Sequence, residues 1–162
     1  VELPASLSEA LIVRKISLFI RTLQESFGLE TPTIGVCGFN PHCGENGTCG
    51  MEEVTMIGPA IAAAQREHPL VEIHGPVPAD TAFWSARQGS FDGVLAMYHD
   101  QGLGPLKTVH FYNAINLSGG LPHLRVSPDH GPASDLFLKN IARTDSFLEA
   151  WNTCLSYLKY NS

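Results

Sequence analysis

The stretch that decides the fold reads Thr33-Ile34-Gly35-Val36-Cys37-Gly38-Phe39-Asn40-Pro41-His42. Its first six residues are apolar or small at every position, a pattern typical of a strand that is buried on both faces of a parallel sheet. A second run of this kind, residues 93–97, is followed by Tyr98-His99-Asp100-Gln101. Ligands of parallel sheets collect beyond the carboxyl ends of the strands. The two polar segments that follow these strands are therefore the first candidates for a functional site.

Helices are predicted around these strands. Ser6-Leu7-Ser8-Glu9 matches a capping box, and apolar residues then recur at spacings of three and four up to Phe27, before Gly28 as a stop. Further helices are expected at about residues 51–66, 80–87 and 145–157, and short strands at 71–73, 113–117 and 123–126. Residues 39–50 are expected to form a long loop, and residues 74–78 to lack regular structure. The predicted fold class is α/β, a mostly parallel sheet flanked by helices, in a single unit over residues 1–162.

Composition narrows the class of protein. The 162 residues are 44% hydrophobic and 16% charged, which excludes a disordered tail or a coiled coil. The net charge is −6 without a basic cluster, so nucleic acid is not an expected partner. No apolar run of about 18 residues and no leader are found, so no membrane association is expected. The four cysteines form no C-x-x-C pair, which favours a reduced, cytoplasmic protein. The absence of an initial Met predicts a piece of a longer chain.

Histidines and carboxylates follow the predicted strands. The imidazoles of His42 and His99 are of the kind that binds zinc and similar divalent ions, and two of them at neighbouring strand ends can share one ion. The alternative, that each bonds a backbone carbonyl, stays open. Asp100 can ligate a metal, orient a ligand or act as a general base, and Asp80 is the second candidate carboxylate. Either one can instead cap a helix, because Asp100 begins a turn-like Asp-Gln-Gly sequence.

Basic residues lie further along the chain. Lys107, Asn116 and Arg125 follow at intervals of nine residues, and Lys and Arg near a metal suit a phosphate or carboxylate ligand. Asp129-His130-Gly131-Pro132-Ala133 is a tight polar turn that opens a helix. Taken alone this turn predicts a helix N-cap, whereas beside a dinucleotide it predicts an adenosine contact.

Four motifs occur in an order that resembles one family. They are Gly38-Phe39-Asn40-Pro41-His42-Cys43-Gly44-Glu45, Gly75-Pro76-Val77-Pro78-Ala79-Asp80-Thr81, Met97-Tyr98-His99-Asp100-Gln101-Gly102-Leu103 and Asp129-His130-Gly131-Pro132-Ala133. Together they resemble the 4-hydroxythreonine-4-phosphate dehydrogenase (PdxA) family of vitamin B6 biosynthesis. The likeness runs from Leu3 to nearly the end of the chain.

The resemblance implies an isocitrate/isopropylmalate dehydrogenase-like fold and a homodimer that shares its active sites. It implies NAD-dependent oxidation of 4-phosphohydroxy-L-threonine, followed by decarboxylation to 3-amino-2-oxopropyl phosphate on the route to pyridoxal phosphate. It also implies a divalent metal, zinc, magnesium or cobalt, which polarises the reacting oxygens and holds the enolate left by CO2.

The resemblance also assigns roles by position. His42 and His99 match two of the family's three metal-binding histidines. Asp80 and Asp100 match carboxylates near the reacting centre, with Asp100 as the proton-transfer partner. The substrate-binding residues of the family are matched by Lys107, Asn116 and Arg125, and its adenosine-binding turn by Asp129, His130 and Gly131.

The chain departs from the family pattern in three places. The third metal histidine of the family lies in a Thr-His-Leu-Pro stretch, which here reads Val1-Glu2-Leu3-Pro4, so Glu2 becomes the third candidate ligand and favours harder ions. Ser134-Asp135-Leu136-Phe137-Leu138 differs from the usual small residues after the adenosine turn. The N-terminal half of the family, with a His-Thr pair that grips substrate, is absent.

Two other functions are compatible with the same residues. A related dehydrogenase of another phosphorylated hydroxy acid, such as threonate or erythronate 4-phosphate, uses the same Lys107, Asn116 and Arg125. A non-catalytic metal-binding or dimerising module is the alternative from a different class.

Overall fold

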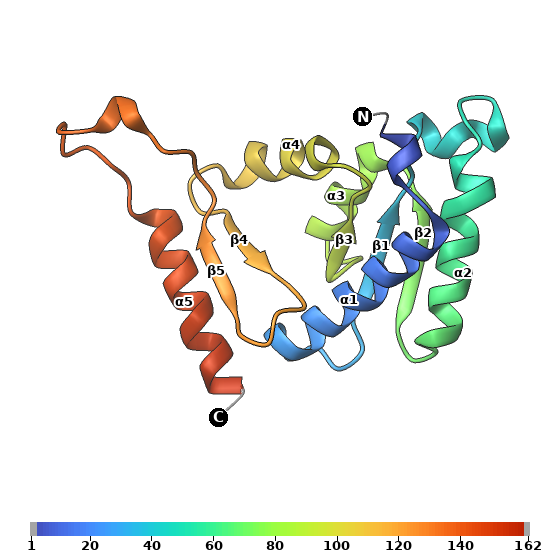
Figure 1. Ribbon diagram of the computed structural model, residues 1–162, viewed down its shortest axis with the longest axis horizontal. Coiled ribbons are helices and arrows are strands. Elements are labelled where there is room, and N and C mark those ends of the chain that lie inside the picture. Colours follow the sequence, from blue (N-terminus) through green and yellow to red (C-terminus); the bar gives the residue numbers. More distant parts are fainter. Residues whose placement is uncertain (1–2, 161–162) are drawn as a thin grey trace. The chain divides into compact units, whose positions relative to one another are not determined.

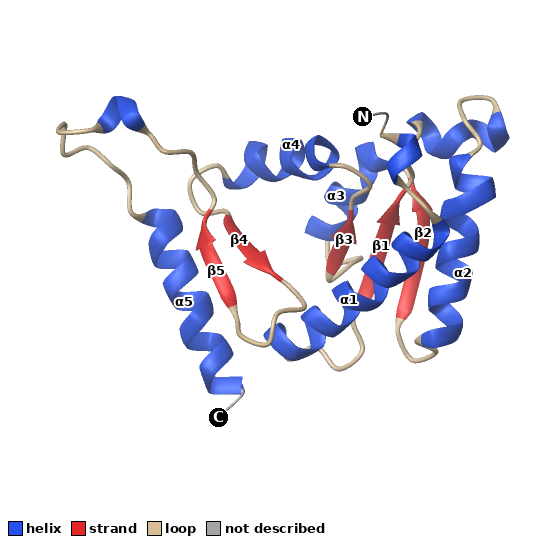
Figure 2. Cartoon of the chain, viewed as in Figure 1, coloured by secondary structure: helices blue, strands red, loops and turns tan. Residues whose placement is uncertain are grey.

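The computed structural model describes residues 3–160, which fall into two compact units with the boundary between Leu103 and Gly104. Each unit contains one sheet (Figure 2). The sequence predicts a single unit, and the division is not visible in it because the boundary falls inside helix α4, His99–His110, where no linker composition marks it. Whether residues 1–162 work as one part of a longer dehydrogenase stays a prediction.

The first unit is built on a three-stranded parallel sheet of order β2-β1-β3. Its strands are β1 (Thr33–Cys37), β2 (Glu72–Val77) and β3 (Gly93–Leu95). Ile34 of the central strand lies opposite Ile73 on one side and Gly93 on the other. The arrowheads in Figure 1 show that all three strands end at the same edge. Most of β1 is buried, and the predicted α/β class with a parallel sheet is confirmed.

Helix α1 (Glu9–Phe27) confirms the predicted first helix. Its N-cap is Ser8, whose Oγ accepts a hydrogen bond from the Leu11 N–H at 3.2 Å, and it ends at Gly28 in the left-handed conformation, φ +69°. Phe19 lies so close over β3 that a side chain at Gly93 would collide with its ring. Helix α2 (Gly58–Glu67) packs against α1 and β2, and α3 (Ala79–Arg87) contacts β1 and β3.

One local prediction in this unit is wrong, and two helices have features that the sequence did not predict. The helix expected at 51–66 is found, and it begins with a π-helical turn, Glu53–Ile57, because Pro59 has no amide hydrogen for a regular turn. Strand β2 continues through the 74–78 segment that was expected to be irregular, since β1 supplies its pairing up to Cys37 opposite Val77; the Gly75–Pro76 peptide bond is cis. Asp100, for which the sequence left a helix-capping role open, lies in the first turn of α4, a helix that also includes Pro105.

The second unit is an antiparallel pair of strands with one helix. Strands β4 (Ile115–Ser118) and β5 (Arg125–Pro128) lie where strands are predicted, but they form a sheet of their own. Helix α5 (Asp145–Tyr160) packs on both strands. The Ser146 Oγ joins them, because it donates to the Ala114 carbonyl at 2.5 Å and accepts from the Asp129 N–H at 3.0 Å.

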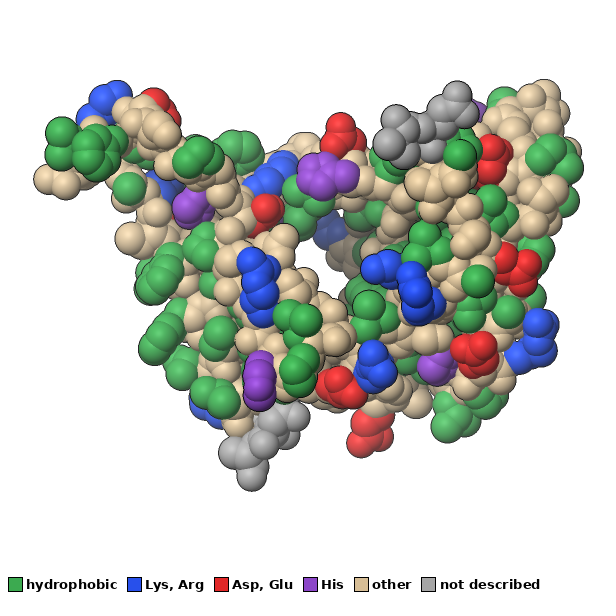
Figure 3. All heavy atoms as spheres, viewed as in Figure 1, with side chains coloured by type: hydrophobic (Ala, Val, Ile, Leu, Met, Phe, Trp, Pro, Cys, Tyr) green, Lys and Arg blue, Asp and Glu red, His purple; other side chains and the backbone are tan. Residues whose placement is uncertain are grey.

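Helix α5 keeps a row of apolar side chains at its surface. Figure 3 shows hydrophobic side chains gathered along this helix. The exposed members are Phe147, Leu148, Trp151, Leu155 and Leu158. No helix formed by residues 3–160 has the length and apolarity needed to cross a membrane.

Candidate active site

The two polar segments that follow β1 and β3 lie side by side, as predicted. The rings of Phe39 and Tyr98, one from each segment, meet edge to face with centroids 6.0 Å apart. Gln101 joins the two strand ends: its Nε2 donates to the Gly38 carbonyl at 2.8 Å, and its Oε1 accepts from the Met97 N–H at 2.7 Å. The segments that carry His42 and His99 are thus connected by hydrogen bonds at the points where they leave the strands.

His42 lies on a left-handed turn, where the sequence predicted only a flexible loop. Residues 42–46 all have positive φ, between 43° and 78°. Each non-glycine residue in this region is strained by about 1–2 kcal/mol. The one glycine of the run, Gly44, is required, because a Cβ there would lie 2.7 Å from both the Glu53 Oε2 and the Gly50 carbonyl oxygen. The turn exposes the His42 side chain to solvent.

Glu53 is a site residue that the sequence analysis missed. It is 4% exposed, and its Oε1 accepts the N–H groups of Phe39 and Asn40, each at 2.7 Å. Its Oε2 accepts from the Asn40 Nδ2 at 2.9 Å. Burial raises the pKa of Glu53, but the hydrogen bonds from Asn40 and Phe39 outweigh burial, so the pKa is lowered overall. A Glu-Glu pair in the first turn of a predicted helix is typical of a solvated surface, so composition gave no signal for this burial.

His99 and Asp100 lie in the first turn of α4 and form a pair. The His99 Nδ1 and the Asp100 Oδ1 are 2.7 Å apart, and the side chains are 80% and 92% exposed. Because Nδ1 is engaged, Nε2 is the ring nitrogen that His99 presents to a ligand. A carboxylate that holds the second nitrogen is the arrangement that orients histidine ligands in metal sites.

Asp80 is exposed in the first turn of α3, near the left-handed turn. Partial burial raises the pKa of the Cys43 thiol, and the negative charges of Glu53 and Asp80 raise it further. Asp80 is therefore close enough to act electrostatically on the residue next to His42. This end of the first unit gathers both candidate histidines and both candidate carboxylates around the ends of β1 and β3.

The donors fit a divalent metal in kind but supply only part of a site. Among residues 3–160, no three His, Cys, Asp or Glu side chains gather closely enough to hold an ion. The third predicted ligand, Glu2, lies outside the described residues. The described residues thus hold no complete metal site, and the roles of His42 and His99 as ligands stay predictions.

Lys107 and Asp129, both in the second unit, form an ion pair. The Lys107 Nζ lies 2.7 Å from the Asp129 Oδ2, with the two side chains 28% and 25% exposed, and it also donates to the Asp129 carbonyl. The structure thus joins a predicted substrate residue to the predicted adenosine turn. In that turn His130 and Gly131 are exposed, and the His130 Nδ1 lies 2.9 Å from the Gly131 carbonyl oxygen.

Asn116 and Arg125 share one face of the β4–β5 pair. Ser118 pairs with Arg125, and Asn116 pairs with Ser127, so these four polar side chains alternate with the apolar ones of the other face. The Arg125 Nη1 donates to the Ser118 Oγ at 3.1 Å, and both Asn116 and Arg125 are exposed. The predicted substrate residues thus include two neighbours on one sheet face.

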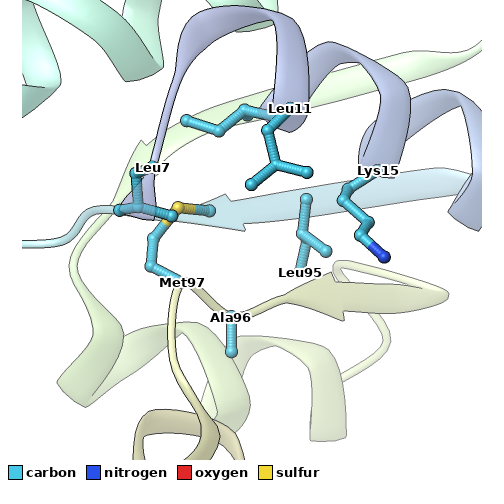
Figure 4. A pocket seen from close by; sticks show the side chains of 7 residues that line it. Leu7, Leu11, Lys15, Leu95, Ala96 and Met97 are labelled. Carbon is cyan, nitrogen blue, oxygen red and sulfur yellow. The ribbon is translucent and has the colours of Figure 1, made fainter. Parts of the chain in front are cut away.

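A pocket of about 220 Å³ lies between α1 and the end of β3. Figure 4 shows Leu7 and Leu11 facing Leu95 and Met97, with Lys15 at the side. The lining is apolar apart from Lys15, and it contains none of the described residues that the sequence predicts for the site. The pocket borders the strand end that leads to His99, so it adjoins the site without being part of it.

Comparison with known proteins identifies the family. The family described as "Pyridoxal phosphate biosynthetic protein PdxA" matches residues 1–154. A 4-hydroxythreonine-4-phosphate dehydrogenase of Thermosynechococcus vestitus is 44% identical over 164 residues, covering 94% of this chain and 48% of the relative. One from Desulforapulum autotrophicum is 43% identical over 149 residues, covering 92% of this chain and 43% of the relative.

Solved structures agree with this assignment. The crystal structure of 4-hydroxythreonine-4-phosphate dehydrogenase from Klebsiella pneumoniae superimposes with a TM-score of 0.81 at 40% identity, covering 96% of this chain and 46% of that one. A terephthalate 1,2-cis-dihydrodiol dehydrogenase from Burkholderia xenovorans gives a TM-score of 0.71 at 28% identity, covering 95% and 48%. The chain spans about half the length of the relatives it matches, and it belongs to the PdxA family of pyridoxal phosphate biosynthetic proteins.

Proposed function

We propose that the chain is part of an NAD-dependent, metal-requiring dehydrogenase that oxidises 4-phosphohydroxy-L-threonine. Decarboxylation then yields 3-amino-2-oxopropyl phosphate for pyridoxal phosphate biosynthesis. The observation that carries the proposal is 44% identity to a 4-hydroxythreonine-4-phosphate dehydrogenase over nearly the whole chain. A cytoplasmic homodimer with shared active sites is part of the same proposal.

The first unit supplies the reacting end of the site. His42 and His99 would hold the divalent ion, with Glu2 or another chain as the candidate source of a further ligand. When bound, the ion polarises the substrate oxygens and NAD accepts a hydride. Asp100 takes the hydroxyl proton at its carboxylate, and its contact with the His99 Nδ1 keeps it close to that imidazole. Asp80 adds a negative charge beside the turn that carries His42.

The second unit supplies groups for the anionic parts of the substrate. Within the described part of the chain, the partner found for the Arg125 guanidinium is the neutral Ser118 hydroxyl, so its charge remains available to a phosphate or carboxylate. Asn116 on the same sheet face adds an amide donor. Lys107 is paired with Asp129, so an anionic ligand has to compete with that carboxylate for the ammonium group.

A second candidate function keeps the chemistry and changes the substrate. Lys107, Asn116 and Arg125 recognise charge rather than the amino group of the substrate, so threonate or erythronate 4-phosphate fits them equally. The fold is also found in a dehydrogenase named for a terephthalate dihydrodiol, which shows that this family's architecture is compatible with other substrates. A non-catalytic metal-binding or dimerising module is the remaining alternative.

Metal content per chain tests the proposal. Elemental analysis is made on the purified chain, on a His42→Ala/His99→Ala variant and on a His110→Ala/His123→Ala control, which removes two exposed histidines of the second unit. We expect about one divalent ion per chain, lost in the first variant and kept in the control. A wild-type chain without metal would refute the metal role of His42 and His99. NADH formation with the three phosphorylated acids, measured on the protein joined to its upstream coding sequence, separates the substrates, and no NADH with any of them favours the module.

A further inference from the structure

Glu53 is a buried carboxylate whose stabilising contacts are all hydrogen-bond donors. It is 4% exposed, and among the described residues no Lys or Arg forms an ion pair with it. Three N–H donors take the place of a cation: the backbone amides of Phe39 and Asn40 on Oε1, and the Asn40 side-chain amide on Oε2. Hydrogen bonds to a carboxylate require a defined geometry, so the Glu53 side chain fixes the positions of the N–H groups that donate to it.

These contacts lie on both sides of His42. Phe39 and Asn40 come directly before the left-handed turn, and Gly44 lies within it, where a Cβ would approach the Glu53 Oε2 to 2.7 Å. The Asn40 carbonyl also accepts a hydrogen bond from the Cys43 N–H at 3.2 Å. Asn40 therefore connects the Glu53 carboxylate to the turn that contains Cys43. Glu53 thus bonds the residues directly before His42 and lies next to Gly44 on its other side.

The turn needs such an anchor. His42, Cys43, Glu45 and Asn46 all adopt positive φ, a conformation that L-residues keep only where surrounding contacts impose it. The His42 side chain itself is exposed. Its place therefore depends on the backbone of the turn, which the hydrogen bonds to the buried Glu53 carboxylate hold at residues 39 and 40.

We propose that Glu53 is a positioning residue for His42: its carboxylate fixes the left-handed turn that presents this imidazole to the divalent ion. The inference rests on the proposed function, in which His42 is a metal ligand. Glu53 does not itself ligate the ion. Its effect on metal binding is indirect, because it holds the backbone of residues 39–44 that carries His42. It therefore adds to the site a residue that belongs to none of the four motifs.

Glu52 offers a matched control. It is the adjacent carboxylate, it carries the same charge, and it accepts a hydrogen bond from the Asn40 Nδ2 at 2.7 Å without touching the backbone amides that Glu53 binds. Glu52→Gln therefore removes one charge one residue away while leaving the three hydrogen bonds of Glu53 in place. Glu53→Leu removes all three acceptor contacts, and Glu53→Gln keeps an oxygen for the two backbone amides but puts an amide group against the Asn40 Nδ2.

The experiment combines two readouts on the full 162-residue chain. Backbone chemical shifts from NMR report whether residues 42, 43, 45 and 46 stay left-handed, and calorimetric titration with Zn²⁺ alone reports the affinity of the site. We expect Glu53→Leu to move these shifts and to weaken Zn²⁺ binding by about tenfold or more, the range found when groups behind metal ligands are removed. Glu53→Gln should give a smaller change in both readouts, and Glu52→Gln should stay within about twofold of wild type.

Two outcomes would overturn the inference. In the first, the turn keeps its left-handed shifts in Glu53→Leu. In the second, the shifts move while the Zn²⁺ affinity stays at the wild-type value, which would leave Glu53 a purely structural role. If Glu53→Leu is unfolded by circular dichroism, Glu53→Gln decides by the same criteria. A wild-type chain that binds no Zn²⁺ would refute the metal role proposed for His42, and with it the inference, and this outcome is recognised before any variant is made.

Discussion

Replacing Gln101 by Leu should loosen the connection between the two strand ends that carry the candidate histidines. The variant has similar volume but loses both hydrogen bonds, the one to the Gly38 carbonyl at 2.8 Å and the one from the Met97 N–H at 2.7 Å. A neutral hydrogen bond contributes about 1 kcal/mol net, and a buried group left without a partner adds to the loss. Since Gly38 is buried, we expect the free energy of unfolding of the first unit to fall by about 2–3 kcal/mol.

Gln101→Glu makes the same argument testable by pH. One carboxylate oxygen still accepts the Met97 N–H, but the other faces the Gly38 carbonyl oxygen, and only the protonated acid can donate to it. The pKa of the new carboxyl is therefore raised in the folded state above its unfolded value of about 4.3. Its stabilising contact is present below that value and is lost as the pH rises through the folded pKa. We expect a loss comparable to that of Gln101→Leu at neutral pH, with partial recovery near pH 4.

Hydrogen exchange read by mass spectrometry measures both variants, because peptides from β1 and β3 report the first unit separately from α5. The peptides of α5 serve as an internal control and should exchange as in wild type. Protection of β1 and β3 in Gln101→Leu within about 0.5 kcal/mol of wild type, the usual range of a neutral surface substitution, would refute the reasoning.

Three further predictions concern stability and reactivity. Ser146→Ala removes two hydrogen bonds between the strands and α5, and should lower the free energy of unfolding of the second unit by about 2 kcal/mol in urea titrations. Because the pKa of Glu53 is lowered on folding, its contribution is present above the unfolded value of about 4.3 and is lost as the pH falls through the folded pKa; acid unfolding followed by circular dichroism should show this loss in wild type and not in Glu53→Gln. Burial raises the pKa of Cys37 to about 11, so iodoacetamide at pH 8 should label the exposed Cys49 first and Cys37 only on unfolding, and equal labelling rates would contradict its burial.

The sequence predicted the helices and strands that are determined by residues close together in the chain. The spacing of apolar residues and the stop at Gly28 are enough to place α1, and the continuous apolar run is enough to place β1. The sequence also predicted that the segments carrying His42 and His99 lie close together, because the carboxyl ends of adjacent parallel strands lie at the same edge of a sheet. The roles of these residues, and of the other predicted site residues, stay predictions.

The features that the sequence did not predict depend on partners far along the chain. Strand β2 runs through Gly75 and Pro76 because β1 pairs with it, and no propensity scale contains that pairing. Helix α4 includes Gly102, Gly104 and Pro105, which favour a turn when read locally. The burial of Glu53 arises from a turn more than ten residues earlier, and the pairing of Lys107 with Asp129 spans 22 positions.

The hydrogen bond from Gln101 to Gly38 has a consequence for the order of folding. It joins residues separated by 63 positions, so forming it costs more chain entropy than a local contact does. During synthesis, the turn with His42 leaves the ribosome well before Gln101 has been added to the chain. Until residue 101 has emerged and β3 has paired with β1, the nascent protein carries one candidate ligand without the other. The contact that joins the two strand ends therefore cannot form until nearly all of the first unit has been synthesised.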